Sequence, residues 1–567
     1  MHLRSRVKIA LAQLNPTVGD IPGNARLIAD AIDRARQGGA ALVVLSELVV
    51  SGYPPRDLLR IEDFVERCER AAGAIGCEHT TGITAVIGTP LRRAGGSIAN
   101  GLLVFRDGTQ IARYEKRLLP TYDVFDEDRY FEPGENPTVF EVDGERVGLA
   151  ICEDLWRGED AGVSSRYADD PDPIGAYTDH AIDLLAVPSA SPFVLGKHEK
   201  HREIVSRTAD RIGAPVASVN QVGANDDLVF DGRSCMIAPD GSVLAGGKAF
   251  GTDLVIVDTR APAASPTPGK ADDERLLIEA LTIGTRDYLG KCGFSSACLG
   301  LSGGIDSALT AAIAVRAIGA DAVLGAAMPG PYSSEGSVTD AYALAKSLGM
   351  RCITMPIAPA YEGHREILDG AYGEIGSHAL GAQRPDVAEE NLQSRVRGAL
   401  MMGLSNRTGS ILLTTGNKSE LAVGYCTLYG DMNGGLAVLS DVPKTLVFRV
   451  CRYMNEHWES LGFREPPIPV STIEKPPSAE LAPGQLDTDS LPPYDVLDEI
   501  VERHVEGHQP AARIADESGF DRALVDRVCR MIDINEYKRR QYAVGLKVTS
   551  IAFGPGRRMP IAQRWRR

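Results

Sequence analysis

Strand-length apolar runs alternate with helical stretches through the second half of the chain, and this alternation restricts the fold more than any other feature of the sequence. Such a succession predicts parallel strands joined by crossover helices, which form a doubly wound sheet. Ligands of these sheets bind beyond the carboxyl ends of the strands. The expected strands are 297–301, 322–328, 352–357 and 411–415. The expected helices are 306–317, 335–348 and 388–404, with a loop between the third strand and the third helix.

The first half of the chain also combines buried strands with helices, but less regularly. Helical stretches are expected at 24–37 and 198–212. A hairpin is expected over 101–114, because Asp107-Gly108 is a favoured hairpin turn. The apolar, β-rich runs of this half are 7–14, 41–48, 84–88, 147–152, 184–188 and 216–220. Both halves are therefore predicted to be α/β.

A stretch rich in proline and alanine, RAPAASPTPGKADD at 260–273, separates the two halves. It has no apolar periodicity, which is typical of a linker. At about 150 residues per domain, a chain of 567 residues has room for two to four domains. We expect one domain over 1–259 and a second over 274–567.

The composition narrows the range of functions. The chain carries 60 Lys+Arg and 76 Asp+Glu, a net charge of −16, so we expect small-molecule substrates and no nucleic acid. No apolar run reaches the roughly 18 residues that span a membrane, so no membrane partner is expected. The ten cysteines are scattered singly, and the N-terminal segment resembles a strand more than a signal peptide. These features indicate a protein of the reducing cytoplasm.

Three reactive side chains of the first half stand where strands are expected to end. Glu47 follows the run ALVVLS, Lys116 follows the hairpin, and Cys152 ends the run ERVGLAIC. A thiol that attacks an amide needs a base for its proton, and a carboxylate can serve when burial raises its pKa. A nearby ammonium can stabilise the thiolate and the tetrahedral oxyanion. Each residue alone is ordinary, since a cysteine in an apolar strand is usually packing and a lysine at a strand end is usually solvated.

Motifs around these residues resemble the signatures of the nitrilase-like amidases. The segments are SEL with GYPPRDLL, then EKRLLPTYDVFDEDRYFEPG, then GLAICEDLW. The resemblance covers most of residues 5–258 and implies a four-layer αββα sandwich. It makes Glu47 the base, Lys116 the oxyanion stabiliser and Cys152 the nucleophile. A second family glutamate, which orients the site, matches Glu127. Positions that hold a glutamine substrate match Tyr122, Ser191 and Lys197.

The second half contains a glycine-rich turn, SGGIDS at 302–307, between an expected strand and an expected helix. Glycines let backbone N–H groups approach a phosphate, and a helix N-terminus adds positive potential. Asp306 would repel a phosphate unless it holds a Mg²⁺ ion that bridges the phosphates. Ordinary turn and helix-cap chemistry would also account for these residues. No Lys follows the glycines, so the turn is not a GxxxxGK[ST] loop.

SGGIDS resembles the loop of the N-type ATP pyrophosphatases. These enzymes cleave ATP to AMP and pyrophosphate and activate a carboxylate as an adenylate, and the resemblance implies an adenine nucleotide α-hydrolase-like doubly wound fold. The implied ATP site comprises Gly300, Leu301, Ser302, Gly303, Gly304, Ile305, Asp306, Ser307 and Thr415.

Further segments resemble the synthetase half of the glutamine-dependent NAD synthetases. They are MPGPYSSEGS, ENLQSRVRGALMMGLSN, TTGNKSELAVGYCTLYGDMNGG, PPSAEL, DSLPPYDVLDEI and EYKRRQ, spread through nearly all of 274–567. The resemblance implies that Asn391, Glu420 and Lys538 bind deamido-NAD. Glu420 is also placed to share Mg²⁺ with Asp306, although an acidic residue in a first helical turn is ordinary. Asn391 and Arg395 are four residues apart on one expected helix, so both can face one ligand or form a solvated face.

Two small departures from these relatives are visible. Gly330-Pro331 stands where relatives usually carry a polar or basic pair, and Ile551 stands where many carry a Lys. Neither affects the residues proposed above, but both bear on contacts to phosphate.

The two resemblances together imply amidation of deamido-NAD to NAD, driven by ATP and supplied with ammonia from glutamine. They also imply an ammonia passage between the sites and a homo-oligomer formed through the synthetase domains. One alternative is an amidase fused to a nucleobase- or tRNA-modifying pyrophosphatase. The acidic charge argues against tRNA, and NKSELAVGYCTLYGDMNGG argues against a nucleobase. Another is a non-enzymatic sensor of glutamine or NAD(H), against which the retained Cys152 and SGGIDS loop argue.

Overall fold

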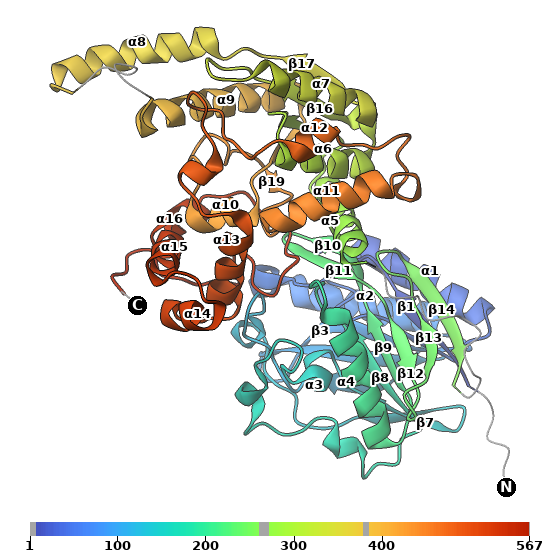
Figure 1. Ribbon diagram of the computed structural model, residues 1–567. Helices are drawn as coiled ribbons and strands as arrows, with labels where there is room; N and C mark the ends of the chain where they lie inside the picture. Colours follow the sequence, from blue (N-terminus) through green and yellow to red (C-terminus); the bar gives the residue numbers. More distant parts are fainter. Residues whose placement is uncertain (1–6, 260–271, 378–384, 566–567) are drawn as a thin grey trace. The chain divides into compact units, whose positions relative to one another are not determined.

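The chain divides into two compact units, Met1–Asp272 and Asp273–Arg567 (Figure 1). The computed structural model describes residues 7–259, 272–377 and 385–565. The expected linker at 260–273 lies outside the described residues except for its last two. Both units are α/β, as the sequence predicts, and each has its own sheets and hydrophobic core.

Two six-stranded sheets form the centre of the first unit, and each has parallel strands in its middle and antiparallel strands toward its edges. The first sheet runs β14 (Asp253–Asp258), β1 (Lys8–Gln13), β2 (Leu42–Val44), β3 (Thr84–Arg92), β4 (Ile98–Arg106), β5 (Thr109–Glu115). The second runs β13 (Val243–Gly246), β12 (Cys235–Ile237), β9 (Val216–Asn220), β8 (Leu184–Ser189), β7 (Glu145–Leu149), β6 (Val139–Val142). A separate hairpin pairs β10 (Val222–Asn225) with β11 (Leu228–Asp231).

The two sheets pack face to face between layers of helices. Val44 of the first sheet and Leu149 of the second belong to one buried apolar cluster. The other face of the first sheet is covered by α1 (Ile21–Gln37) and α2 (Phe64–His79), and α4 (Lys197–Ile212) packs against β9 and β12. This arrangement is the four-layer αββα sandwich that the sequence predicts.

Two turns of this unit affect the site. The hairpin of β4 and β5 turns at Asp107 and Gly108, whose φ angles of 48° and 78° suit the predicted hairpin turn. The strand β2 is shorter than the apolar run 41–48 predicts. The chain leaves the sheet after Val44 and turns at Leu48, which has a φ of 46°. Glu47 therefore lies on a buried turn just beyond the carboxyl end of the strand.

A five-stranded parallel sheet forms the centre of the second unit (Figure 1). Its strands, in order across the sheet, are β17 (Arg351–Thr354), β16 (Val323–Ala327), β15 (Ala297–Gly300), β18 (Ile411–Thr414) and β19 (Leu436–Ala437). The chain moves outward from β15 to one edge and then returns to the other side of β15. This reversal is the switch point at which doubly wound sheets bind ligands.

Helices flank the sheet, and most match the predicted ranges. α6 (Ile305–Ile318) packs against β15 and β16, whereas α9 (Val387–Thr408) packs against β15 and β18. Beside them lie α5 (Asp273–Lys291), α7 (Glu335–Leu348), α10 (Lys418–Val423), α11 (Lys444–Glu456) and α12 (Val470–Glu474). The C-terminal part packs α13 (Tyr494–Val501), α14 (Ala511–Ser518) and α15 (Arg522–Ile534) around a separate apolar cluster, followed by α16 (Glu536–Arg539).

The prediction of a loop after 352–357 is wrong, because the segment that follows this strand forms the helix α8 (Ala358–Glu374). Its sequence contains three glycines, which weaken a helix, and only Tyr361 is fully buried. The segment therefore lacks the strong apolar periodicity that marks α6 or α9. No helix among the described residues is long and apolar enough to cross a membrane.

Candidate active sites

Cys152 lies on a sharp turn between β7 and the short helix α3 (Glu153–Trp156) of the first unit. Its φ angle is 43°, a conformation that costs energy for a residue with a side chain. The turn is held in place because the Cys152 backbone N–H donates to the carbonyl of Pro188 at 3.0 Å. A strained strand-to-helix turn of this kind is typical of a nucleophile presented at the end of a sheet.

Lys116 connects two buried glutamates beside this turn. Its Nζ lies 2.7 Å from Oε1 of Glu47 and 2.9 Å from Oε1 of Glu127, and Lys116 and Glu47 are both only 1% exposed. Glu47 also accepts hydrogen bonds from the side chain of Asn100 at 2.7 Å and from the backbone N–H of Ala190 at 3.0 Å. The structure thus brings together the predicted base, oxyanion stabiliser and orienting glutamate.

The electrostatics of this cluster keep the thiol protonated. Burial raises the pKa of Cys152 well above its ordinary value, and the negative charge of Glu47 adds to the effect while Lys116 opposes it. Burial alone would lower the pKa of Lys116, but the charges of Glu127 and Glu47 outweigh it and raise this pKa. Burial raises the pKa of Glu127 to about 7 against the opposing charge of Lys116. A neutral thiol in this setting attacks only when a base removes its proton, which a carboxylate at Glu47 can do.

The three predicted glutamine-binding residues contact different partners within the first unit. The hydroxyl of Tyr122 donates to Oε2 of Glu153 at 2.9 Å. The backbone N–H of Ser191 donates to Oδ1 of Asn220 at 2.9 Å, and Lys197 forms an ion pair with Asp160 at 2.8 Å. Ser191 and Lys197 line one small cavity of about 40 Å³, which does not include Tyr122. Their role in binding glutamine stays a prediction.

Glu153 is a buried carboxyl that the motif analysis did not single out. It follows the nucleophile directly and is 2% exposed. Burial raises its pKa to about 8, and the nearby charge of Asp160 adds to this shift. The Tyr167 hydroxyl faces its carboxyl, and within the described part of the chain the Nε1 of Trp156 is buried without a hydrogen-bond partner. A buried polar atom without a partner is typical of a site shaped for a polar ligand.

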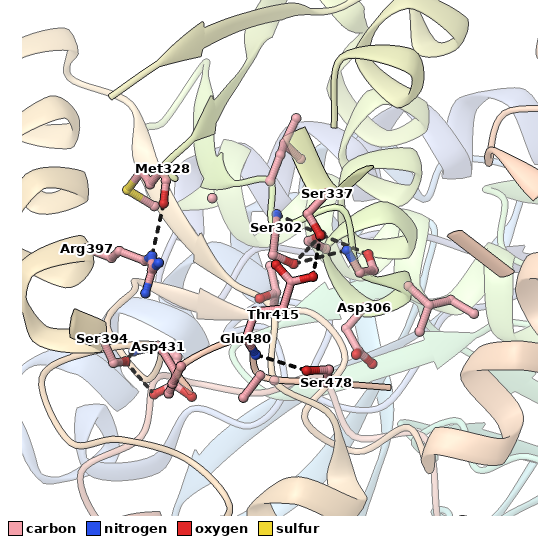
Figure 2. Close-up of a pocket in the computed structure, with 18 of the residues that line it drawn as sticks. Ser302, Asp306, Met328, Ser337, Ser394, Arg397, Thr415, Asp431, Ser478 and Glu480 are labelled. Atoms are coloured by element: carbon pink, nitrogen blue, oxygen red, sulfur yellow. Dashed lines mark hydrogen bonds between the residues drawn. The ribbon is translucent and has the colours of Figure 1, made fainter. Parts of the chain in front are cut away.

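The second unit contains a cavity of about 310 Å³ beyond the carboxyl ends of β15, β16 and β18 (Figure 2). Its size suits a nucleotide. All the predicted ATP-site residues except Gly303 line this cavity. They are Gly300, Leu301, Ser302, Gly304, Ile305, Asp306, Ser307 and Thr415.

Gly303 shapes the loop without lining the cavity. Its φ angle is +73°, and a Cβ atom built on it would lie 2.4 Å from the carbonyl oxygen of Ser337. Only glycine permits this close approach between the loop and the first turn of α7. Within the loop, the hydroxyls of Ser302 and Ser307 lie 3.2 Å apart, and the Gly304 N–H donates to Oγ of Ser302 at 3.2 Å. The loop leads into α6 at Ile305, as a phosphate-binding turn requires.

Asp306 and Glu420 converge on one point, which Lys444 occupies. The Lys444 Nζ lies 2.5 Å from Oδ2 of Asp306 and 3.1 Å from Oε1 of Glu420. Burial raises the pKa of Glu420 to about 7, opposed by Lys444. Lys444 was missed in the sequence, because nothing in its local spacing relates it to a loop far earlier in the chain.

Three polar residues that were predicted or suggested to contact a ligand bind other groups of the protein. Asn391 accepts from the Thr427 hydroxyl at 2.8 Å, Arg395 donates to the carbonyl of Leu428 at 3.2 Å, and neither lines the cavity. Lys538 donates to the carbonyls of Gly424 and Cys426, both at 2.7 Å. All three residues therefore form hydrogen bonds to one segment of the protein, 424–428. Their role in binding a ligand stays a prediction.

The arginine that does reach the cavity is Arg397 (Figure 2). Its Nε donates to the carbonyl of Met328 at 3.1 Å, and burial lowers its pKa to about 10. A Cβ atom on Gly330 would lie 2.6 Å from its Nη2, so the glycine at this departure from relatives leaves room for the guanidinium.

A buried thiol with a glutamate and a lysine in one unit, and a nucleotide-sized cavity at a glycine-rich loop in the other, define a two-domain ligase with an amidase domain. The family model for carbon-nitrogen hydrolases matches residues 8–268, and the model for NAD synthases matches residues 277–542. Glutamine-dependent NAD(+) synthetases from Synechocystis sp. and Rhodobacter capsulatus are 46% and 42% identical to the chain. The alignments cover 98% of both chains for the first and 100% for the second. The chain belongs to the glutamine-dependent NAD(+) synthetase family.

Solved structures agree with this assignment. The glutamine-dependent NAD+ synthetase of Acinetobacter baumannii, solved in complex with ADP, is 37% identical, with a TM-score of 0.76 and 98% of each chain covered. The synthetase of Cytophaga hutchinsonii is 22% identical with a TM-score of 0.82, which shows the shared fold.

Proposed function

We propose that the chain converts deamido-NAD, ATP and glutamine to NAD, AMP, pyrophosphate and glutamate through an adenylate, with residues 1–259 releasing ammonia and residues 274–567 consuming it. The ATP-dependent amidation follows from the family. The observation that carries the assignment of steps is the buried cluster of Glu47, Lys116 and Cys152, because it supplies amide cleavage in a chain whose other unit has a nucleotide cavity.

Glutamine is cleaved through a thioester. The Cys152 sulfur attacks the side-chain amide carbon while its proton passes to the carboxylate of Glu47. The ammonium of Lys116 stabilises the oxyanion, and ammonia leaves with the proton that Glu47 returns. Water then attacks the thioester, again giving its proton to Glu47, and glutamate leaves as the Cys152 thiol regains that proton. Glu127 keeps Lys116 in place for both halves of the reaction.

Deamido-NAD is activated at the second site. An oxygen of its nicotinate carboxylate attacks the α-phosphorus of ATP, and the bond to the bridging oxygen of pyrophosphate breaks. Ammonia then attacks the acyl carbon of the adenylate, and AMP leaves. The loop at 302–307 suits this chemistry, because it presents backbone N–H groups and hydroxyls to phosphate oxygens. Asn391, Glu420, Lys538 and the segment 424–428 are proposed to hold deamido-NAD.

The acidic residues at this site fit a Mg²⁺ ion. Asp306 and Glu420 are oxygen donors facing one point, and Mg²⁺ is usually held by one or two carboxylates together with substrate phosphates. Among the described residues, no group of three or more His, Cys, Asp or Glu side chains gathers to hold a metal by itself. When bound, Mg²⁺ would neutralise phosphate charge.

Ammonia is protonated in water at neutral pH, and ammonium is not nucleophilic. We therefore include in the proposal a passage that delivers ammonia from one site to the other without mixing with solvent. We also propose a cytoplasmic homo-oligomer formed through the synthetase units. No two cysteines in the described part of the chain form a disulfide, which supports a reducing compartment.

The test is a nitrogen-transfer assay with amide-labelled ¹⁵N-glutamine. The wild-type chain should give NAD labelled in its amide, and C152A should lose glutamine-supported synthesis while keeping synthesis from free ammonia. Loss of both activities in a folded C152A protein would contradict the division of labour. Pyrophosphate release that does not require deamido-NAD would contradict the assignment of deamido-NAD as the acceptor substrate.

A further inference from the structure

We propose that Lys475 binds the β- and γ-phosphates of ATP, and then the pyrophosphate product, at the loop 302–307. This inference rests on the proposed function, since it adds a cation to the ATP site. The loop itself carries no lysine after its glycines, in contrast to GxxxxGK[ST] loops. A triphosphate bound there needs positive charge from another part of the chain.

Lys444 has few donors left for a phosphate, because both of its acidic neighbours are close. Its Nζ lies 2.5 Å from Asp306 and 3.1 Å from Glu420, so two of its three N–H donors are already used. Arg397 lies at the other side of the cavity, where it is bound to Met328. Lys444 lacks available donors, and Arg397, which has N–H donors to spare, lacks the position beside the loop, since it lies against Met328 and Gly330.

Lys475 has both. It lines the cavity, and its ammonium makes its one hydrogen bond within the described part of the chain to the Ser337 hydroxyl, at 2.5 Å. Lys475 also forms ion pairs with Glu480 at 3.6 Å and Asp340 at 3.8 Å, but both are beyond hydrogen-bond range and use none of its N–H donors. An ammonium has three N–H donors, so two remain for phosphate oxygens.

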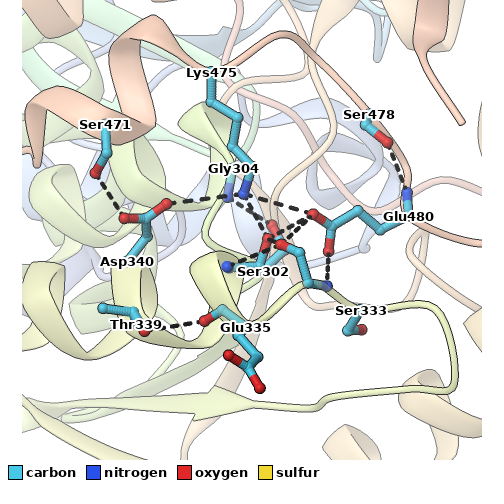
Figure 3. A network of polar contacts seen from close by, with 12 residues as sticks. Ser302, Gly304, Ser333, Glu335, Thr339, Asp340, Ser471, Lys475, Ser478 and Glu480 are labelled. Carbon is cyan, nitrogen blue, oxygen red and sulfur yellow. Dashed lines mark hydrogen bonds and ion pairs between the residues drawn. The ribbon is translucent and has the colours of Figure 1, made fainter. Parts of the chain in front are cut away.

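The ammonium is held directly beside the phosphate loop. The Ser337 hydroxyl accepts a hydrogen bond from Lys475 and donates one to Glu480. Ser337 is also the residue against which Gly303 packs without room for a Cβ. Lys475, Ser302 and Gly304 line the same cavity, and Figure 3 draws them within one network of polar contacts. Two segments far apart in the sequence thus place a cation and a phosphate-binding turn side by side.

Glu480 fixes the segment that carries Lys475. Its carboxylate accepts from the hydroxyls of Ser334 at 3.0 Å and Ser337 at 2.7 Å, and from the Ser334 backbone N–H at 3.3 Å (Figure 3). These bonds tie 475–481 to the first turn of α7. Glu480 is therefore a positioning residue, and Lys475 is the residue that touches substrate.

The chemistry predicts for which ligands the binding affinity depends on Lys475. When the α-phosphorus–oxygen bond breaks, its electron pair goes to the bridging oxygen, and the charge on pyrophosphate grows. A cation at the β- and γ-phosphates stabilises that charge. AMP has neither phosphate, so its binding does not depend on this ammonium.

The experiment compares K475M with the wild type and with K346M, a matched loss of an exposed lysine on α7. Binding of α,β-methylene-ATP, inorganic pyrophosphate and AMP, each with Mg²⁺, is measured by calorimetry on the full chain. K475M should bind the first two roughly tenfold or more weakly and AMP within about twofold of wild type. K346M should match the wild type throughout, and K475R, which keeps the charge, should bind pyrophosphate more tightly than K475M.

Unchanged pyrophosphate binding in K475M would overturn the proposal, and so would an equal loss for AMP, which would indicate a general distortion of the site. AMP binding by K475M reports whether the second unit, which carries the substitution, is folded. Should K475M fail to fold, pyrophosphate binding to K475R and K475Q decides by the same criterion. If wild-type protein binds pyrophosphate but makes no NAD from deamido-NAD, the proposed function fails while the assignment of Lys475 stands.

Discussion

At the scale of single residues, the first site depends on one buried cation that serves two carboxylates. Lys116 lies between Glu47 and Glu127, and all three side chains are removed from water. Breaking a buried ion pair by removing one partner leaves an uncompensated charge, which costs more than the pair contributes. Lys116 therefore has a structural role in addition to the stabilisation of an oxyanion.

Replacing Lys116 by Met should destabilise the first unit by about 3–5 kcal/mol at neutral pH. Glu127 would lose the charge that opposes burial, so its pKa should rise further above about 7, and the loss should grow as the pH rises from about 5 to 8. Urea unfolding measures it, followed by the tryptophan fluorescence of a W458F/W565F background in which Trp156 is the remaining tryptophan. K200M on α4, where the Lys200 side chain is 41% exposed, is the control, and equal stability of K116M and K200M would contradict the prediction.

Glu153 predicts a second pH effect. Its pKa is about 8 in the fold and 4.5 when unperturbed, so between these values the folded chain holds a proton that the unfolded chain releases. Stability therefore falls as the pH rises from about 4.5 to about 8, by up to about 1.4 kcal/mol per pH unit. E153Q mimics the protonated form, and its advantage in unfolding temperature over wild type should increase across this window. A difference that stays constant with pH would rule out the raised pKa.

At the scale of elements, the phosphate loop depends on a glycine that does not line the cavity. G303A would combine a positive φ with a Cβ 2.4 Å from the Ser337 carbonyl, so either the loop or α7 must move. We expect ATP-dependent synthesis to fall by roughly tenfold or more, with glutaminase activity unchanged. Rates of NAD formation and glutamine hydrolysis on the same preparation measure this.

The matched control is G293A, because Gly293 also has a positive φ, of +83°, but open space around its Cβ position. It should cost about 1–2 kcal/mol in stability and leave synthesis intact. Equal loss of synthesis in both variants would show that backbone strain, and not the contact with Ser337, is responsible.

The helices and strands were largely predictable from the sequence, because the signals that specify them lie in neighbouring residues. Period and turn signals placed α6, α7, α9 and the hairpin of β4 and β5, because each depends on neighbouring residues. The helix α8 was missed because its glycines and single buried tyrosine leave little periodic signal. Lys444, Arg397 and Lys475 were missed because each reaches the cavity from an element far along the chain, and no local spacing records such convergence.

At the scale of the whole molecule, the two chemistries are expected to be coupled within one chain. The test mixes equal amounts of two variants, C152A and G303A. C152A is expected to make an adenylate but no ammonia, and G303A to make ammonia but little adenylate. With glutamine as donor, the mixture should form NAD at about a tenth of the wild-type rate or less, because a passage within each chain cannot supply another chain. A rate near half of the wild type would show that ammonia travels through solvent. Added ammonium chloride should restore synthesis by C152A in the same assay.

The burial of Cys152 has a practical consequence for chemical labelling. It is 4% exposed and its pKa is raised, whereas Cys77 and Cys292 are exposed. General alkylating reagents such as iodoacetamide will therefore modify the surface thiols first, and early modification will say nothing about catalysis. An electrophile shaped like glutamine, whose entry brings it beside the base, is the reagent that can select the nucleophile from the other nine thiols.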